Sequence, residues 1–104
     1  MIREATEEDI PQLKQLFRVC FGDTNAFLNL FFSEYFQTTT CMVALRDKRI
    51  VSMLFLCPAK IKAEESLRLI YYVYACGTLP EYRRLGIMDQ LLQVSHAFAR
   101  QQDA

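Results

Sequence analysis

The residues with the clearest chemical potential lie between an apolar run and a helical pattern, late in the chain. From Thr78 to Asp89 the segment reads Thr-Leu-Pro-Glu-Tyr-Arg-Arg-Leu-Gly-Ile-Met-Asp. The first N–H groups of a helix have no partner within the helix, and the helix dipole is positive at that end. Gly86 has no side chain to keep an anion from the backbone, and Arg83 and Arg84 add mobile positive charge. The segment therefore predicts an anion site suited to a pyrophosphate.

Two elements must flank this turn in order to position it. Leu67–Cys76 is the most apolar run of the chain and predicts a central strand. The connection Gly77–Tyr82 contains Pro80 and leads to apolar residues at helical spacing, which predict a long last helix: Leu85, Met88, Leu91, Leu92, Ser95, Phe98 and Ala99. An ordinary solvated turn between strand and helix is the alternative interpretation.

The first third of the chain has helical periods. Ile2–Ala5 predicts a short first strand, and Thr6, followed three residues later by Asp9, resembles a helix-capping arrangement. Apolar residues at helical spacing then predict an amphipathic helix that Gly22 closes: Ile10, Leu13, Leu16, Phe17, Cys20 and Phe21. Asn25–Phe36 is apolar over most of its circumference, which predicts a largely enclosed helix, either in the core or as a lid over a substrate cleft.

The middle of the chain changes to strand-forming composition. Thr40–Arg46 and Arg49–Pro58 are apolar runs separated by Asp47 and Lys48, which predicts an antiparallel hairpin. A polar turn at Ala63–Ser66 leads to the next strand. The order is strand, two helices, three strands and a helix. It predicts an α/β (α+β) fold with a mixed, mainly antiparallel sheet, flanking helices and the last helix on one face.

One segment carries a family resemblance. Pro-Glu-Tyr-Arg-Arg-Leu-Gly-Ile, from Pro80 to Ile87, resembles motif A of the GNAT superfamily of N-acetyltransferases. That motif reads Gln/Arg-x-x-Gly-x-Gly/Ala, and Arg83 to Met88 matches it through Gly86. The opening Ile-Arg-Glu-Ala-Thr-x-x-Asp-Ile looks like a GNAT first strand and helix. The resemblance implies one partial GNAT domain over residues 1–104, truncated after the motif A helix. Met88 in this motif resembles the methionine of the two-lobed acetyltransferases of the enhanced-intracellular-survival type, whose GNAT lobe is the front part of a longer chain.

The resemblance implies a co-substrate and the residues that hold it. The chain would be the cofactor-binding portion of an acetyl-CoA-dependent N-acetyltransferase, an enzyme that acylates a primary amine of a small molecule or peptide. The backbone at Cys76, Gly77 and Thr78 would pair with the pantetheine arm like an added strand, and the N–H groups from Arg84 through Asp89 would hold the pyrophosphate. The implied cofactor-binding residues are Cys76, Gly77, Thr78, Arg83, Arg84, Leu85, Gly86, Ile87, Met88 and Asp89.

Two departures from the motif favour an alternative. Met88 stands where the motif prefers glycine or alanine, and Asp89 places a negative charge in the same turn. These departures support a second hypothesis, a non-catalytic acyl-CoA-binding module. A protein-interaction module with a GNAT-like fold, which associates through its exposed strand edge, is a further alternative. No catalytic residue is assigned, because the tyrosine that the family commonly uses as general acid belongs to the part of the fold after this helix. Tyr72 and Tyr74 are interpreted as packing residues on one face of a strand.

Composition excludes several classes of protein. Twelve basic and twelve acidic side chains cancel, so the chain lacks the positive charge of a nucleic-acid binder. No apolar run approaches the length of a membrane span, and the N-terminus is too acidic for a signal peptide. Four dispersed cysteines, Cys20, Cys41, Cys57 and Cys76, suggest a reducing cytoplasm. With His96 as the single histidine, no metal site is expected.

The same apolar strand predicts association. In Leu67–Cys76, Arg68 is the only charged residue and no proline interrupts the run. An exposed apolar strand edge is a template for pairing with another chain. We therefore expect a homodimer, or association through this edge.

Overall fold

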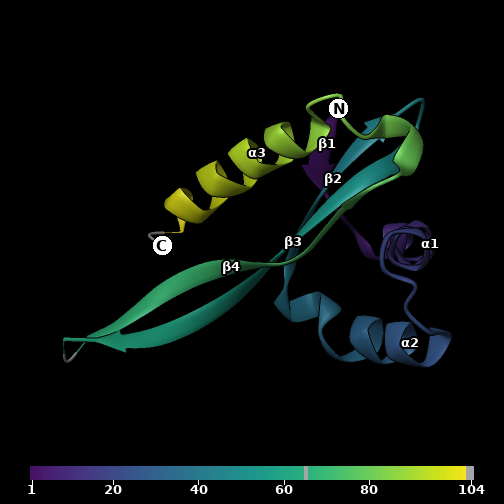
Figure 1. The fold of residues 1–104 in the computed structure, drawn as a ribbon. Coiled ribbons are helices and arrows are strands. Elements are labelled where there is room, and N and C mark those ends of the chain that lie inside the picture. Colours follow the sequence, from purple (N-terminus) through teal and green to yellow (C-terminus); the bar gives the residue numbers. More distant parts are fainter. Residues whose placement is uncertain (65, 103–104) are drawn as a thin grey trace.

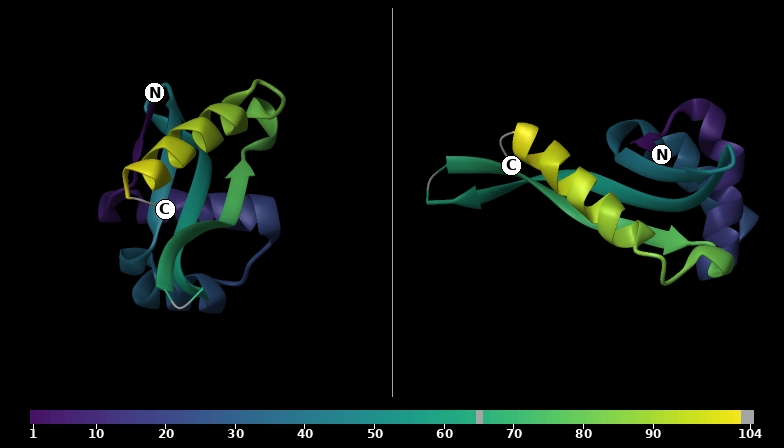
Figure 2. Two further views of the ribbon diagram at one scale, coloured as in Figure 1. Left: turned by 90° about the vertical axis from the view of Figure 1, so that its left-hand side faces the viewer. Right: turned by 90° about the horizontal axis from the view of Figure 1, so that it is seen from above.

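A four-stranded antiparallel sheet organises the structure, a computed structural model that describes residues 1–64 and 66–102 (Figure 1). The strands follow one another across the sheet in chain order: β1 (Ile2–Glu4), β2 (Thr40–Arg46), β3 (Arg49–Ala63) and β4 (Ser66–Thr78). One face is covered by two helices and the opposite face by one (Figures 1 and 2): α1 (Ile10–Phe21) with α2 (Asn25–Glu34), and α3 (Ile87–Gln101). The predicted α+β fold, with the last helix on one face, is confirmed. None of these helices is long and apolar enough to cross a bilayer.

The central strand is β3. Its residues Ile50–Leu56 are buried throughout, because β2 and β4 flank the strand and helices lie on both of its faces. In the part of the chain that the structure describes, β4 pairs with β3 alone. The prediction that Leu67–Cys76 is a strand is confirmed, but the prediction that it is central is wrong. An apolar run does not distinguish a strand enclosed by a core from an edge strand whose side chains line a surface hollow.

The two hairpin turns differ in how well the sequence predicted them. Asp47 and Lys48 both take left-handed backbone, with φ of 52° and 66°, as a two-residue hairpin turn requires. The first hairpin is therefore confirmed. β3 runs past Pro58, the predicted end, because its pairing with β2 stops at Leu56 and a proline is tolerated where one side of a strand is open. The second predicted turn includes Glu65, which lies outside the described residues.

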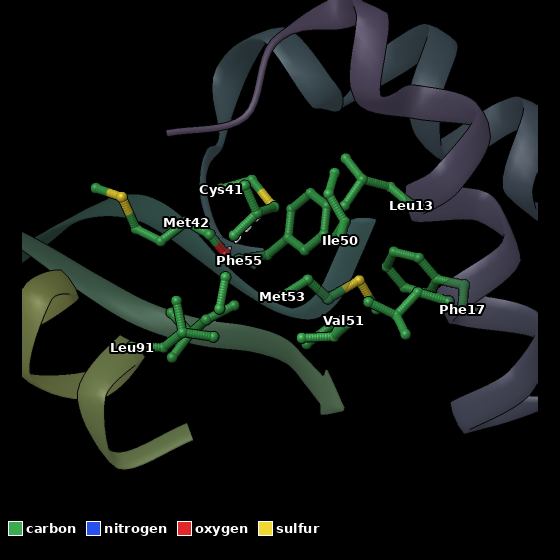
Figure 3. Packing of buried hydrophobic residues seen from close by; sticks show 14 of the residues in the cluster. Leu13, Phe17, Cys41, Met42, Ile50, Val51, Met53, Phe55 and Leu91 are labelled. Carbon is green, nitrogen blue, oxygen red and sulfur yellow. Dashed lines mark hydrogen bonds between the residues drawn. The ribbon is translucent and has the colours of Figure 1, made fainter. Parts of the chain in front are cut away.

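A cluster of aromatic rings surrounds Phe55 on the side of α1 and α2. The centroid of its ring lies 5.5 Å from those of Phe17 and Phe31 and 6.2 Å from that of Phe32. On the other side of the sheet α3 contributes Leu91, which is fully buried (Figure 3). Burial of a large apolar side chain stabilises the folded state by about 1.5–3 kcal/mol. Packing on both faces therefore holds the sheet between its helices.

α2 is less enclosed than predicted. Leu28, Phe31 and Phe32 are buried against the sheet, whereas Phe27 is 38% exposed and Leu30 is 55% exposed. The expectation of a largely enclosed helix is therefore wrong. Only one side of α2 packs on the protein, and the apolar residues on its other side border a surface hollow.

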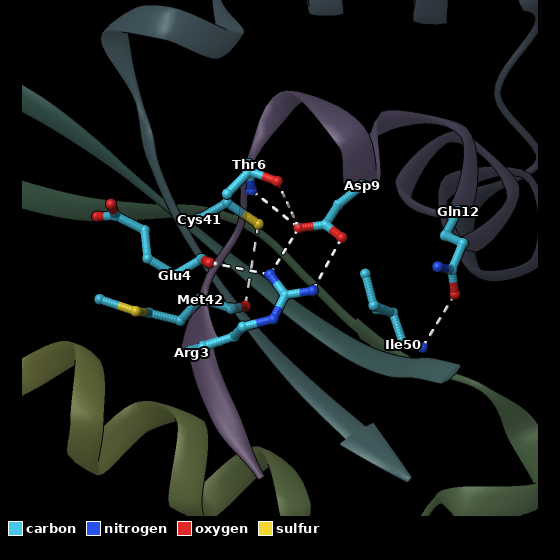
Figure 4. A network of polar contacts seen from close by, with 8 residues as sticks. All are labelled: Arg3, Glu4, Thr6, Asp9, Gln12, Cys41, Met42 and Ile50. Atoms are coloured by element: carbon cyan, nitrogen blue, oxygen red, sulfur yellow. Dashed lines mark hydrogen bonds and ion pairs between the residues drawn. The ribbon is translucent and has the colours of Figure 1, made fainter. Parts of the chain in front are cut away.

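An ion pair joins β1 to the start of α1 (Figure 4). The guanidinium of Arg3 donates to both carboxylate oxygens of Asp9, over 2.7 Å from Nη1 to Oδ2 and 3.0 Å from Nη2 to Oδ1. The carboxylate also accepts the N–H of Thr6 at 2.8 Å, so the predicted capping arrangement is confirmed. The hydrogen bond from Arg3 outweighs burial and lowers the pKa of Asp9.

We expect Asp9→Asn to lower the free energy of unfolding by about 1–3 kcal/mol at neutral pH, because it removes hydrogen bonds to a charged group. The pKa of Asp9 is lower in the folded protein than in the unfolded one. The stabilisation is therefore complete above the unfolded carboxyl pKa and is lost as the pH falls through the folded pKa. The difference between wild type and variant should shrink from neutral pH toward about pH 3.

Urea denaturation at both pH values measures this difference. Glu8→Gln is the matched control, because Glu8 is an exposed carboxyl in the same turn, and it should leave the stability nearly unchanged. A difference between Asp9→Asn and wild type that stays constant with pH would contradict the assignment.

Candidate functional site

The turn between β4 and α3 is anchored to the core at both ends. The N–H of buried Leu79 donates to the carbonyl oxygen of Val51 at 2.8 Å, and buried Ile87 begins α3. Between these two residues the chain makes a 3-10 turn at Pro80–Tyr82 and then runs along the surface. The turn is therefore held in place while its middle stays open to a ligand.

Two residues in left-handed backbone decide where α3 begins. Arg84 has a φ of 66° and Gly86 a φ of 78°, and an α-helix cannot pass through such residues. The predicted start of the helix near Leu85 is therefore too early, and the side chain of Leu85 is exposed. A left-handed residue other than glycine costs about 1–2 kcal/mol. Local strain of this kind is found preferentially at binding sites and active sites.

A hollow of about 240 Å³ lies against this turn. We call it the turn hollow. It brings together most of the residues predicted to bind the cofactor: Thr78, Arg83, Arg84, Gly86, Ile87, Met88 and Asp89. Tyr82 also lines it and was not predicted, although it lies within the motif. The remaining predicted residues lie outside the lining: Cys76 and Gly77 precede it on β4, and Leu85 does not border it.

Most backbone N–H groups at this turn have no protein acceptor. The N–H of Leu85 closes the turn at Arg83 and Arg84, whereas those of Arg84 and of Gly86 through Asp89 donate no hydrogen bond to another described residue. The first hydrogen bond of the helix runs from the N–H of Gln90 to the carbonyl oxygen of Gly86 at 3.2 Å. A Cβ at Gly86 would meet no atom within 4 Å, so the turn is open at this residue. Unpaired N–H groups at the positive end of a helix dipole form a site for an anion.

The charged side chains at the turn have different roles. Arg83 is not the mobile charge that the sequence predicted, because its Nε–H donates to the carbonyl oxygen of Thr78 at 2.9 Å. Its Nη2 also lies 3.9 Å from the Sγ of Cys20. The side chains of Arg84 and Asp89 have no hydrogen-bond or ion-pair partner among residues 1–64 and 66–102. One free cation and one free carboxylate therefore border the turn hollow.

The end of β4 is packed tightly against its neighbours. A Cβ at Gly77 would lie 2.8 Å from the Sγ of Cys20, so α1 leaves no room for a side chain there. The Oγ of buried Ser52 lies 2.8 Å from the Oγ1 of Thr78 and 3.2 Å from the carbonyl oxygen of Gly77. No motif pointed to Cys20 or Ser52, because these contacts exist only once α1 and β3 have met β4.

A bulge interrupts β4 at Tyr74. Ala75 lies opposite Phe55 and Val73 lies opposite Leu56, so Tyr74 is an extra residue on its strand. Its ring stacks on that of Phe31, with centroids 5.4 Å apart and an angle of 11° between the planes. The residues of β4 before the bulge belong to the ribbon that projects beyond the helices (Figures 1 and 2), and Tyr71 in this part still contacts Phe98 of α3, with ring centroids 5.6 Å apart.

A second hollow, of about 470 Å³, lies between α2 and the β3–β4 ribbon. We call it the aromatic groove. Its lining contains no charged side chain: Phe27, Leu30, Phe31, Tyr35, Thr38, Thr39, Cys57, Pro58, Tyr72 and Tyr74. Burial raises the pKa of Cys57 and of Tyr74, and the Cys57 thiol raises the pKa of Tyr72. These groups therefore stay neutral at neutral pH. A smaller hollow of about 280 Å³ shares Phe27 and Tyr74 with the groove and adds Phe17, Phe21, Asp23 and Ala75.

Comparison with known proteins agrees with this geometry. A family model described as an acetyltransferase (GNAT) domain matches residues 1–104, and no curated protein matches the chain in sequence.

Three solved structures share the fold at low sequence identity. An aminoglycoside 6'-N-acetyltransferase from Acinetobacter baumannii has a TM-score of 0.79 at 19% identity, over 100% of this chain and 74% of its own. A conserved protein from Enterococcus faecalis has a TM-score of 0.91 at 16% identity, over 100% of this chain but 27% of its own. An aminoglycoside N-acetyltransferase in complex with CoA has a TM-score of 0.72 at 12% identity, over 98% of this chain and 72% of its own.

The contact between Gly77 and Cys20 gives a testable prediction. We expect Gly77→Ala to lower the free energy of unfolding by about 1–3 kcal/mol, because the new methyl group cannot be accommodated without moving α1 or β4. Cys20→Ala in the same chain should restore part of the loss, since it removes the sulfur atom at 2.8 Å but leaves the Cβ at 3.2 Å. Thermal unfolding of the two single variants and the double variant measures the coupling. Additive losses would contradict the packing argument.

Proposed function

The chain belongs to the GNAT acetyltransferase family, and from this premise we propose that it holds acetyl-CoA along the end of β4 and at the turn hollow, and transfers the acetyl group to a primary amine. Under this proposal the pantetheine arm lies beside Cys76, Gly77 and Thr78. The pyrophosphate lies at the N–H groups from Arg84 through Asp89.

The run of unpaired N–H groups at the start of α3 is the observation that carries this proposal. Five backbone donors without an acceptor among the described residues, at the positive end of a helix, suit a group with several anionic oxygens. Arg83 supports the site indirectly, because its hydrogen bond to Thr78 ties the turn to the end of the strand. Arg84 supplies the free positive charge beside the donors.

The chemistry follows from the bound thioester. Acetyl-CoA supplies an activated acyl group: the amine nitrogen forms the new C–N bond, the C–S bond breaks, and the proton lost by the amine balances the thiolate that leaves as free CoA. The amine must be unprotonated to attack, so the acceptor site has to favour the neutral amine. Structural neighbours named as aminoglycoside N-acetyltransferases support a small-molecule amine as acceptor, with a peptide amine as the alternative.

The four free cysteines of the described chain support the cytoplasmic assignment.

A non-catalytic acyl-CoA-binding module is the second candidate function. The carboxylate of Asp89 borders the turn hollow without a partner, where it would repel a phosphate. Met88 also borders the hollow, but its side chain packs against the core and so leaves part of the space free. CoA binding without turnover of any primary amine would favour this candidate.

Substitution of Gly86 tests the proposed binding site. We expect millimolar CoA to raise the melting temperature of the wild type, since a ligand at one hundred times its Kd stabilises the folded state by about 2.7 kcal/mol. Gly86→Glu should abolish the rise, because a carboxylate at this open point repels the phosphates. Gly86→Gln imposes the same backbone strain and nearly the same size without the charge, and should keep part of the rise. Equal CoA shifts for the glutamate and glutamine variants would contradict a phosphate site at this turn.

Association through β4 is a further part of the proposal. Within the described chain the outer edge of β4 has no strand partner, and Leu67 and Val73 are exposed on this strand. We expect self-association at micromolar concentration in sedimentation velocity experiments. Val73→Lys should weaken it, because a charge on an edge strand opposes pairing. Val94→Lys, on the exposed side of α3, is the matched control. A wild-type chain that sediments as a monomer would contradict the proposal.

A further inference from the structure

The aromatic groove is a large hollow that the cofactor site does not use. It lies on the side of the sheet that carries α2, opposite α3 (Figure 1). Five large apolar or aromatic side chains that line it are 38–55% exposed: Phe27, Leu30, Tyr35, Tyr72 and Tyr74. Concentration of such residues in one concave patch marks a binding surface rather than ordinary scattered exposure.

The rings of the groove are arranged to receive a flat guest. Phe31 is stacked on Tyr74, at 5.4 Å and 11°, and on Phe27, at 6.2 Å and 22°. Tyr35 lies 6.2 Å from Phe31 at 35°. Near-parallel rings present faces and edges on which another ring can stack with an offset. The groove therefore favours a ligand with a planar, apolar body.

A single carboxylate stands at one end of this surface. Asp23 lines the smaller hollow, which shares Phe27 and Tyr74 with the groove and reaches Ala75. Asp23 is partly buried and has no hydrogen-bond or ion-pair partner among the described residues. The neutral groove thus continues into a site with one negative charge, which is complementary to one ammonium group.

This charged end lies toward the proposed cofactor. Ala75 borders the smaller hollow, and the next residue on β4 is Cys76, the first of the three whose backbone is proposed to pair with the pantetheine arm. An amine held near Asp23 would therefore lie on the side of the groove that is nearer to the thioester. The Asp23 carboxylate favours binding of the ammonium form, whereas the low polarity of the groove lowers the pKa of an ammonium group by desolvation. The bound amine must still lose a proton before it attacks the thioester.

We propose that the aromatic groove and the Asp23 hollow together bind the acyl acceptor, and that this acceptor is a primary monoamine with a flat aromatic body. This inference rests on the proposed acyltransferase function and specifies its substrate class. The body of the amine lies among Phe27, Tyr72 and Tyr74, and its amino group points toward Asp23. A polycationic acceptor such as an aminoglycoside does not fit, because its other ammonium groups would lie in a groove that has no carboxylate.

Three probes separate the two parts of the site. Isothermal titration calorimetry of the full chain with 2-phenylethylamine, 2-phenylethanol and kanamycin compares a monoamine, the same body without an amine, and a polycation. We expect 2-phenylethylamine to bind more tightly than kanamycin. Asp23→Asn should weaken the binding of 2-phenylethylamine by about tenfold, which corresponds to 1.4 kcal/mol. The same variant should leave the binding of 2-phenylethanol unchanged.

A second variant tests the groove itself. Leu30 lies on the rim of the groove and is 55% exposed, so the Leu30→Asp variant should fold. It should weaken the binding of 2-phenylethanol, because it places a charge in the apolar surface. Leu92→Asp, at an exposed position of α3 on the opposite face, is the control and should change the binding of neither phenyl probe. Binding of kanamycin more tightly than the monoamine, no detectable binding of either phenyl probe, or equal effects of Asp23→Asn on both phenyl probes would each overturn the inference.

The CoA melting shift distinguishes this inference from the function on which it rests. A wild-type chain that binds 2-phenylethylamine as described but shows no CoA shift would contradict the proposed acyltransferase and leave the monoamine site standing. A chain that shows the CoA shift but binds neither phenyl probe would support the cofactor site and overturn the monoamine site.

Discussion

The antiparallel pairing of β3 with β4 places both candidate ligand sites on one strand. Its register sets Ser52 opposite Thr78 at one end, where the turn hollow lies, and Cys57 opposite Tyr72 further along, where the aromatic groove lies. Between these points the extra residue Tyr74 turns its ring onto Phe31 of α2. β3 is buried between two layers of helices, so its pairing with β4 fixes β4 relative to the core. The residues of β4 that line the two hollows are therefore held in place.

The turn after β4 combines local strain with external anchoring. Left-handed backbone at Arg84 and Gly86 prevents the helix from starting earlier and leaves N–H groups unpaired. Such an arrangement is unfavourable by itself and persists where its surroundings hold it. Here the hydrogen bond from Leu79 to Val51 and the one from Arg83 to Thr78 hold the first part of the turn, and the burial of Ile87 holds the end. Under the proposed function, these unpaired donors are preorganised for the pyrophosphate before it binds.

The aromatic groove explains why apolar residues lie on the exposed side of α2. A helix that is apolar on most sides is normally enclosed, which led to the prediction that Asn25–Phe36 is a largely enclosed helix, either in the core or as a lid over a substrate cleft. In the structure the same composition serves two surfaces: Phe31 and Phe32 pack on Phe55, and Phe27 and Leu30 line the groove. The structure rules out a helix fully enclosed in the core, and the alternative of a lid over a substrate cleft stays a prediction. The helix therefore contributes both to the core and to the wall of the groove.

Local sequence determined much of this protein, because much of it depends on neighbouring residues. The strand and helix periods, the turn at Asp47 and Lys48, the capping of Asp9 onto Thr6 and the motif around Gly86 all involve residues a few positions apart, and each was predictable. Tertiary structure decided what depends on distant segments. It made β3 central instead of β4, and brought Cys20 against Gly77 and Ser52 against Thr78. It also set Asp23 beside Tyr74, which no spacing in the chain indicates, because only the packing of α1 and α2 on the sheet brings that carboxylate to β4.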